Sequence, residues 1–221
     1  LMETTKKNKS TLHLMGLTSD GGVHSHIGYV LKLIPLLKEK GIKRIVFHAI
    51  TDGRDTYIKS GVKYIKEVDN LLKEEKLGYV GTICGRYYAM DRDNKWERTK
   101  KYYDLVIKNK GFKVNDYELA INNCYQKNIT DEFLPPLVVQ EDCNIKASDT
   151  LLWFNFRPDR ARQILTCLTN PEFAEFKTDY QVESWNMFEV NDVSNIHTLF
   201  DIQRSDIYPI GKYFSDLKLT Q

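Results

Sequence analysis

The sequence predicts an α/β fold, a three-layer α/β/α domain that is doubly wound around a largely parallel sheet. Two observations support this prediction. Short, almost wholly apolar runs of strand length alternate along the chain with longer segments whose apolar residues repeat at helical spacing. Each run also ends in a polar loop that leads into the next helical segment, which is typical of the strand–helix units of parallel sheets.

Strands are expected where aliphatic, β-branched and aromatic residues cluster without a helical period. The four main runs are residues 11–17, 44–50, 77–84 and 151–156. Because these runs are apolar over most of their length, we expect them to be buried. An extended stretch is expected at residues 133–139 around two consecutive prolines, and a last strand within residues 180–190.

Helices are expected between the strands. Residues 27–40 have apolar side chains at helical spacing and end at Gly41, with Pro35 favouring a kink because it removes one backbone donor. The same kind of spacing predicts helices at residues 59–76, 95–108, 117–126 and 207–217. Pro158 suits a first helical turn, so the helix that ends near Thr169 is expected to begin at about Arg157.

Composition excludes several classes of partner. The 221 residues include 42% hydrophobic and 28% charged residues, with a formal net charge of +2. Neither nucleic acid nor a membrane is an expected partner, because the charges nearly balance and the apolar runs are too short to span a bilayer. Scattered cysteines and the lack of a signal-peptide core favour a cytoplasmic protein. Residues 1–10 are expected to be a linker or an excised boundary, and residues 11–221 one domain of a larger protein.

Four polar loops follow the four main strands, at residues 20–26, 52–55, 86–93 and 157–160. The carboxyl ends of parallel strands meet at one edge of the sheet, where open α/β folds bind their ligands. The loops supply five arginines, whose planar guanidinium groups match the oxygens of phosphate or carboxylate: Arg54, Arg86, Arg92, Arg157 and Arg160. The sequence therefore predicts an anion pocket at this edge.

The other loop residues have alternative interpretations. Asp55 is either a general base or a structural partner of the arginines, and the aspartates Asp52, Asp91, Asp93 and Asp159 are expected to brace loops. His24 and His26 are possible metal ligands beside Asp20, although an imidazole that donates to an anionic oxygen fits better. The chain has no Walker phosphate loop and no serine with an evident activating base. The chain looks like a substrate-binding domain without an evident catalytic nucleophile.

These loop sequences resemble cofactor-independent (2,3-bisphosphoglycerate-independent) phosphoglycerate mutases. The resemblance rests on four stretches in matching order: Leu-Met-Gly-Leu-Thr-Ser-Asp-Gly-Gly-Val-His-Ser-His from Leu14, Asp-Gly-Arg-Asp from Asp52, Gly-Arg-Tyr-Tyr-Ala-Met-Asp-Arg-Asp from Gly85, and Asn-Phe-Arg-Pro-Asp-Arg-Ala-Arg from Asn155. It covers residues 10–169, and the remainder more loosely. The family's lysine-bearing hinge is expected just beyond Gln221, and Thr18 stands where leucine is common.

The resemblance implies the phosphotransferase, or substrate-binding, domain of a two-domain isomerase of the alkaline-phosphatase superfamily. The other domain would carry the nucleophilic serine and two manganese ions, with no metal expected in this chain. 3-Phosphoglycerate or 2-phosphoglycerate would be bound by His24, Arg54, Asp55, Arg86, Arg92, Arg157 and Arg160. Asp55 would act as acid or base toward the glycerate hydroxyls, and this domain alone would be inactive.

Two other functions are open at this point. One is a stand-alone module that binds phosphosugars or other anions without catalysis. The other is a metal-dependent phosphohydrolase that uses Asp20, His24 and His26. Flanking sequence that encodes a serine and Asp/His metal motifs would favour the mutase domain over the stand-alone module. Stoichiometric manganese or zinc bound to this chain alone would favour the phosphohydrolase.

Overall fold

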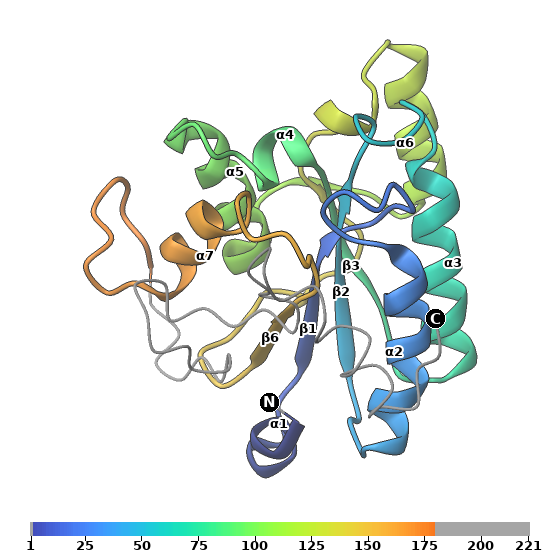
Figure 1. Ribbon diagram of the computed structural model, residues 1–221, viewed down its shortest axis with the longest axis vertical. Coiled ribbons are helices and arrows are strands. Elements are labelled where there is room, and N and C mark those ends of the chain that lie inside the picture. Colours follow the sequence, from blue (N-terminus) through green and yellow to red (C-terminus); the bar gives the residue numbers. More distant parts are fainter. Residues whose placement is uncertain (1, 180–221) are drawn as a thin grey trace.

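The computed structural model describes residues 2–179, which form a six-stranded sheet between two layers of helices (Figure 1). The strands are β1 (Leu12–Leu17), β2 (Ile45–Thr51), β3 (Gly78–Gly85), β4 (Phe112–Lys113), β5 (Leu137–Val138) and β6 (Thr150–Trp153). The helices are α1 (Met2–Asn8), α2 (Ile27–Glu39), α3 (Gly61–Glu74), α4 (Arg86–Ala89), α5 (Trp96–Lys108), α6 (Tyr117–Gln126), the 3₁₀ turn η1 (Asp131–Phe133) and α7 (Arg162–Thr169). The strand expected within residues 180–190 and the helix expected at 207–217 lie outside the described residues.

The sheet is largely parallel, as predicted. Its strand order is β4-β5-β3-β2-β1-β6, and only the β3–β5 pair among the described strands is antiparallel. The chain winds from β1 to β3 in one direction and then returns to place β6 on the free side of β1. The crevice at the carboxyl ends of β1 and β6 is therefore a topological switch point, where open α/β sheets bind ligands.

Two hydrophobic clusters confirm the three-layer prediction. One contains Leu12 and Leu14 of β1 and packs under α2, α3 and α6. The other contains Met15 and Leu17 of β1 and packs under α5 and α7, which lie on the opposite face (Figure 1). Successive residues of a strand point to opposite faces, so strands covered on both sides are apolar nearly throughout. No helix among the described residues is long and apolar enough to cross a bilayer.

Residues at the start of the chain form more regular structure than a linker. Met2–Asn8 are helix α1, and Thr5 on it is buried and donates a hydrogen bond to Thr150 of β6 at 2.9 Å. The helix is thereby attached to the edge strand of the sheet. The role of residues 1–10 as a boundary within a longer protein stays a prediction.

The predicted start of the last described helix was wrong. Helix α7 begins at Arg162, and the preceding residues form a turn in which the Ala161 N–H donates to the Pro158 carbonyl at 2.9 Å. The N–H groups of Phe156 and Arg157 instead donate to the His24 carbonyl, at 2.9 and 3.3 Å. These long-range bonds attach the residues before α7 to the β1 loop, and a turn at residues 158–161 separates them from the helix.

Candidate functional site

The four predicted loops meet at the carboxyl edge of the sheet. Each neighbouring pair of loops is joined by a hydrogen bond or ion pair: Ser19 to Asp52, Asp55 to Arg86, Arg92 to Asp159, and Phe156 to His24. The third loop is not wholly irregular, because Arg86 begins the single-turn helix α4. The predicted convergence is confirmed, and it brings the arginines and carboxylates of four strand ends into one cluster.

Arg86 lies at the centre of the first half of this cluster. Its side chain is only 3% exposed, and its Nη1 donates to Asp52 Oδ1 at 2.7 Å and to Asp55 Oδ2 at 2.5 Å. Burial would lower the pKa of Arg86, but Asp55 and Asp52 raise it above its ordinary value. The guanidinium group therefore remains charged and holds both carboxylates in fixed positions.

Asp52 is the buried anchor of the second loop. It accepts hydrogen bonds from the Ser19 hydroxyl at 2.6 Å and from the backbone N–H of Asp55 at 3.0 Å. Burial would raise the pKa of Asp52, but these two donors and Arg86 hold it below its ordinary value. Gly53 has φ +65°, and a Cβ there would lie 2.8 Å from the backbone nitrogen of Glu132, so the tight turn requires glycine.

Asp159 joins the other half of the cluster. Its Oδ2 accepts from Arg92 Nη1 at 2.7 Å and from Arg157 Nη2 at 3.1 Å. Burial would raise the pKa of Asp159, but Arg157, His24 and Arg92 lower it. The expected brace is thus present, linking the third and fourth loops.

His24 lies between the two halves. Its ring is 3% exposed, with Nε2 3.9 Å from Asp55 Oδ2 and Nδ1 3.6 Å from Asp159 Oδ1. Burial and then the positive charge of Arg86 lower the pKa of His24 to about 4. The imidazole is therefore neutral at physiological pH, with one N–H to donate and one nitrogen to accept.

Arg160 and Arg54 are the two arginines of the cluster that do not pair with Asp52, Asp55 or Asp159. Arg160 Nη1 donates to the Met90 carbonyl at 3.0 Å, and no ion pair with a carboxylate is formed within residues 2–179. Burial, followed by the charges of Arg92, Arg86 and Arg54, lowers the pKa of Arg160, which nonetheless stays protonated. Arg54 is 59% exposed on its side chain and lies 3.4 Å from Glu132 Oε1. Their positive charges are available to an external anion.

Several residues that support the site were not predicted. Ser19 and Glu132 contact the second loop, and Gln163 of α7 donates to Asp91 at 2.8 Å and contacts Thr99. Asp131 is fully buried and accepts from the N–H groups of Ser60 and Gly61, which begin α3. Their roles were not predicted because each contacts a segment distant in the sequence, although Ser19 lies within the first of the matching stretches.

The histidines and aspartate of the predicted metal alternative have separate partners. Asp20 accepts a hydrogen bond from the Tyr64 hydroxyl at 2.6 Å, and His26 Nδ1 accepts from the Gly28 N–H at 3.1 Å to cap α2. His24 faces Asp55 and Asp159 instead. Among the described residues, no group of three or more His, Cys, Asp or Glu side chains is arranged to hold a metal ion.

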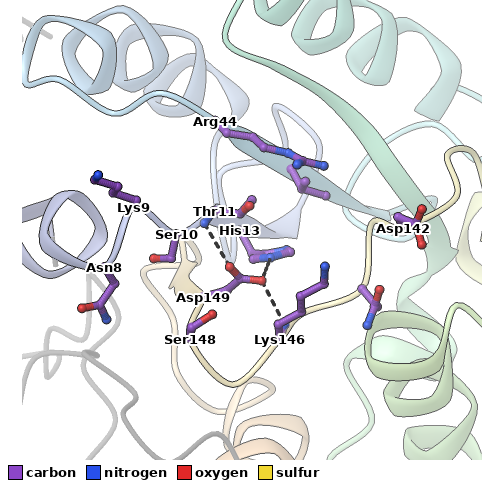
Figure 2. Close-up of a pocket in the computed structure, with 12 residues that line it drawn as sticks. Asn8, Lys9, Ser10, Thr11, His13, Arg44, Asp142, Lys146, Ser148 and Asp149 are labelled. Carbon is purple, nitrogen blue, oxygen red and sulfur yellow. Dashed lines mark hydrogen bonds and ion pairs between the residues drawn. The ribbon is translucent and has the colours of Figure 1, made fainter.

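A cavity of about 140 Å³ lies at the opposite edge of the sheet, near the amino ends of β1 and β6 (Figure 2). Asp149 lies on its wall and accepts from the Thr11 N–H, the Lys146 N–H and the His13 ring (Figure 2). His13 also contacts His48 at 2.8 Å between ring nitrogens. Both histidines are buried, and they form a polar network that is separate from the arginine cluster.

These buried histidines predict that stability decreases in mild acid. Burial lowers the pKa of His13 and of His48, so below the unfolded value of about 6.5 the unfolded chain binds more protons than the folded chain. His24 contributes in the same direction. The free energy of unfolding should fall from pH 7.5 to pH 6, by up to about 1.4 kcal/mol per pH unit for each histidine. Urea denaturation at several pH values measures this, and a constant or rising stability toward pH 6 would contradict it.

The fold and the site define a class of protein: an α/β domain that presents a cluster of arginines at the switch point of its sheet. The chain belongs to the family described as "BPG-independent PGAM N-terminus", whose model matches residues 1–192. The resemblance expected from the loop motifs is thereby confirmed.

Individual relatives agree with this assignment. The chain is 46% identical over 180 residues to the 2,3-bisphosphoglycerate-independent phosphoglycerate mutase of Clostridium perfringens (strain ATCC 13124), covering 80% of this chain and 35% of that protein. It is 41% identical over 226 residues to the enzyme of the same name from Clostridioides difficile (strain 630), covering 100% and 44%. The chain thus spans less than half the length of these curated relatives.

A solved structure supports the fold as well. Crystal structures of Leishmania mexicana phosphoglycerate mutase at low cobalt concentration include a chain that matches with a TM-score of 0.75 and 28% identity. The match covers 80% of this chain and 34% of that chain. The matched portion again corresponds to a part of a longer phosphoglycerate mutase.

Proposed function

We propose that this chain is the substrate-binding domain of a phosphoglycerate mutase, an isomerase that interconverts 3-phosphoglycerate and 2-phosphoglycerate in glycolysis. The observation that carries the proposal is the gathering of five arginines, His24 and Asp55 from four loops at one edge of the sheet. Phosphoglycerate has a phosphate and a carboxylate, and the forked donors of arginine match both groups.

The residues divide between two roles in this proposal. Arg160 pairs with no carboxylate among the described residues, and Arg54 is 59% exposed beside Glu132, so both have charge available for the ligand. Arg86, Arg92 and Arg157 are held in place by Asp52, Asp55 and Asp159. A preorganised cluster of this kind fixes the substrate and neutralises its charge without rearranging at the moment of reaction. These are the main requirements of phosphoryl transfer.

The nucleophile and the metals are proposed to lie in a second domain of the same polypeptide. The relatives' greater length supports a further domain, and the described residues contain no arranged metal ligands. Two manganese ions there would supply Lewis-acid stabilisation and an activated serine. Asp55, at 3.9 Å from His24 Nε2, is placed to exchange a proton with a glycerate hydroxyl. The cytoplasm is the proposed location.

The division of labour predicts that the 221-residue chain has no mutase activity by itself. A coupled assay should detect no conversion of 3-phosphoglycerate by the purified chain, because the phosphoryl acceptor is missing. The longer protein containing this chain should convert it when supplied with manganese. Turnover by the chain alone, in material free of host mutase, would contradict the proposal.

A further inference from the structure

Two buried polar atoms in the site face each other without hydrogen bonds. His24 Nδ1 and Asp159 Oδ1 lie 3.6 Å apart, and neither has a hydrogen-bond partner among the described residues. Buried polar atoms without partners are rare in folded proteins. A shift of about 0.6 Å would bring the pair to ordinary hydrogen-bond distance.

The position of the Asp159 carboxylate is fixed by its other contacts. Oδ2 accepts hydrogen bonds from both Arg92 and Arg157. Arg157 Nε is 2.8 Å from Oδ1, but its geometry is that of an ion pair and leaves Oδ1 without a hydrogen-bond donor. The N–H groups of residues 156 and 157 donate to the His24 carbonyl, and these bonds hold the loops of His24 and Asp159 together.

The Nε2 side of the His24 imidazole faces an oxygen that already accepts a hydrogen bond. Nε2 lies 3.9 Å from Asp55 Oδ2, and that oxygen already accepts from Arg86 at 2.5 Å. The neutral imidazole has a single N–H, so the two carboxylates compete for it. The closer and unfilled acceptor is Asp159 Oδ1, which favours placing the N–H on Nδ1.

We infer that Asp159 is a positioning residue that holds His24 in its Nδ1–H tautomer and so presents the Nε2 lone pair beside Asp55. What this tautomer does for the substrate rests on the proposed function. Nε2 and the Asp55 carboxylate form a pair of acceptors suited to a hydroxyl of the glycerate. His24 then accepts from the substrate, whereas the sequence favoured donation to an anionic oxygen. A carboxylate that accepts from one ring nitrogen of a histidine fixes its tautomer and orients the other, reactive nitrogen.

The tautomer is measured directly by ¹⁵N NMR of the histidine-labelled 221-residue chain at pH 7.5. The signals of His24 are assigned by their loss in His24→Gln. We expect Nδ1 to be the protonated nitrogen in the unsubstituted chain without ligand. Protonation of Nε2 instead would overturn the inference, whatever any variant does.

The same NMR measurement on the Asp159→Asn variant is the second part of the test. Arg92 Nη1 and Arg157 Nη2 only donate, so they keep the amide oxygen at the Oδ2 position. The NH₂ group then takes the Oδ1 position and donates to His24 Nδ1, while Arg157 Nε loses its ion-pair partner there. His24 should then change to the Nε2–H tautomer, and 3-phosphoglycerate should bind about tenfold more weakly because one acceptor is lost. An unchanged tautomer in Asp159→Asn would overturn the inference.

Arg92→Ala is the matched control, because it removes a partner of Asp159 but keeps the carboxylate. Its His24 tautomer should stay Nδ1–H, and a change there would show that loop displacement, not the carboxylate, decides the tautomer. Failure of the unsubstituted chain to bind 3-phosphoglycerate, with the tautomers as expected, would count against the proposed function and leave the role of Asp159 standing.

Discussion

Replacing Arg86 by alanine is expected to lower the free energy of unfolding by about 3–5 kcal/mol, as is typical when one partner of a buried ion pair is removed. The substitution would leave Asp52 and Asp55 without their shared cation, and their side chains are only 2% and 18% exposed. Urea denaturation of the chain measures the loss. The same change should release the second loop, since Arg86 is its ionic link to the third.

Arg92→Ala is the control for this experiment. Arg92 also pairs with a carboxylate, but its side chain is 46% exposed and that of Asp159 is 30% exposed. Exposed pairs contribute about 0–1 kcal/mol, so Arg92→Ala should change stability little. Asp52→Asn in the Arg86→Ala background should restore part of the stability by removing one unpaired charge. Similar small losses for Arg86→Ala and Arg92→Ala would contradict the central role of Arg86.

Replacing Arg160 by alanine is expected to weaken phosphoglycerate binding roughly ten- to a hundredfold, since a charge-assisted hydrogen bond contributes about 1.5–3 kcal/mol. Arg160 forms no ion pair with a carboxylate among the described residues, and its Nη1 donates to the Met90 carbonyl. Arg160→Ala therefore removes a contact with the ligand without also removing an internal ion pair. The comparison is made as kcat/KM in the longer protein, with the 3-phosphoglycerate affinity of this chain as a second measurement.

Arg162→Ala is the matched control for Arg160→Ala. Arg162 begins α7 only two positions along, and its side chain is exposed. Arg98 is unsuitable as a second control. Its guanidinium lies 3.2 Å from Asp91 and stacks on the Tyr87 ring at 4.0 Å, so its removal would disturb the third loop. Equal losses for Arg160→Ala and Arg162→Ala would mean that the ligand binds elsewhere.

Hydrophobic patterning was sufficient to predict most of the described fold. The α6 bounds agree with the predicted range, and β1, β2 and β3 each lie within one residue of theirs. The start of α7 was predicted several residues too early, because Pro158 suits a tight turn as well as a first helical turn, and the structure forms the turn. Helix α1 was missed because its polar sequence carries no apolar period, and its attachment depends on Thr150, far along the chain.

The site was predictable in composition but not in its internal pairing. Each strand end has a polar loop, so the rule for parallel sheets was enough to bring the arginines together. Which arginine keeps a free charge depends on carboxylates from other loops, as Arg86 with Asp52 and Arg160 without a partner illustrate. Such pairings are determined by three-dimensional packing, and spacing along the chain does not encode them.

The most direct test of the central claim is a crystal structure of the chain with 3-phosphoglycerate. We expect the ligand at the carboxyl edge of the sheet, contacted by arginines from at least two of the four loops, with Arg160 among them. The cavity at the amino edge, lined in part by Lys9, Arg44 and Lys146, is the alternative cationic location (Figure 2). Phosphoglycerate bound in that cavity, with the arginines of the cluster still paired with Asp52, Asp55 and Asp159, would contradict the account.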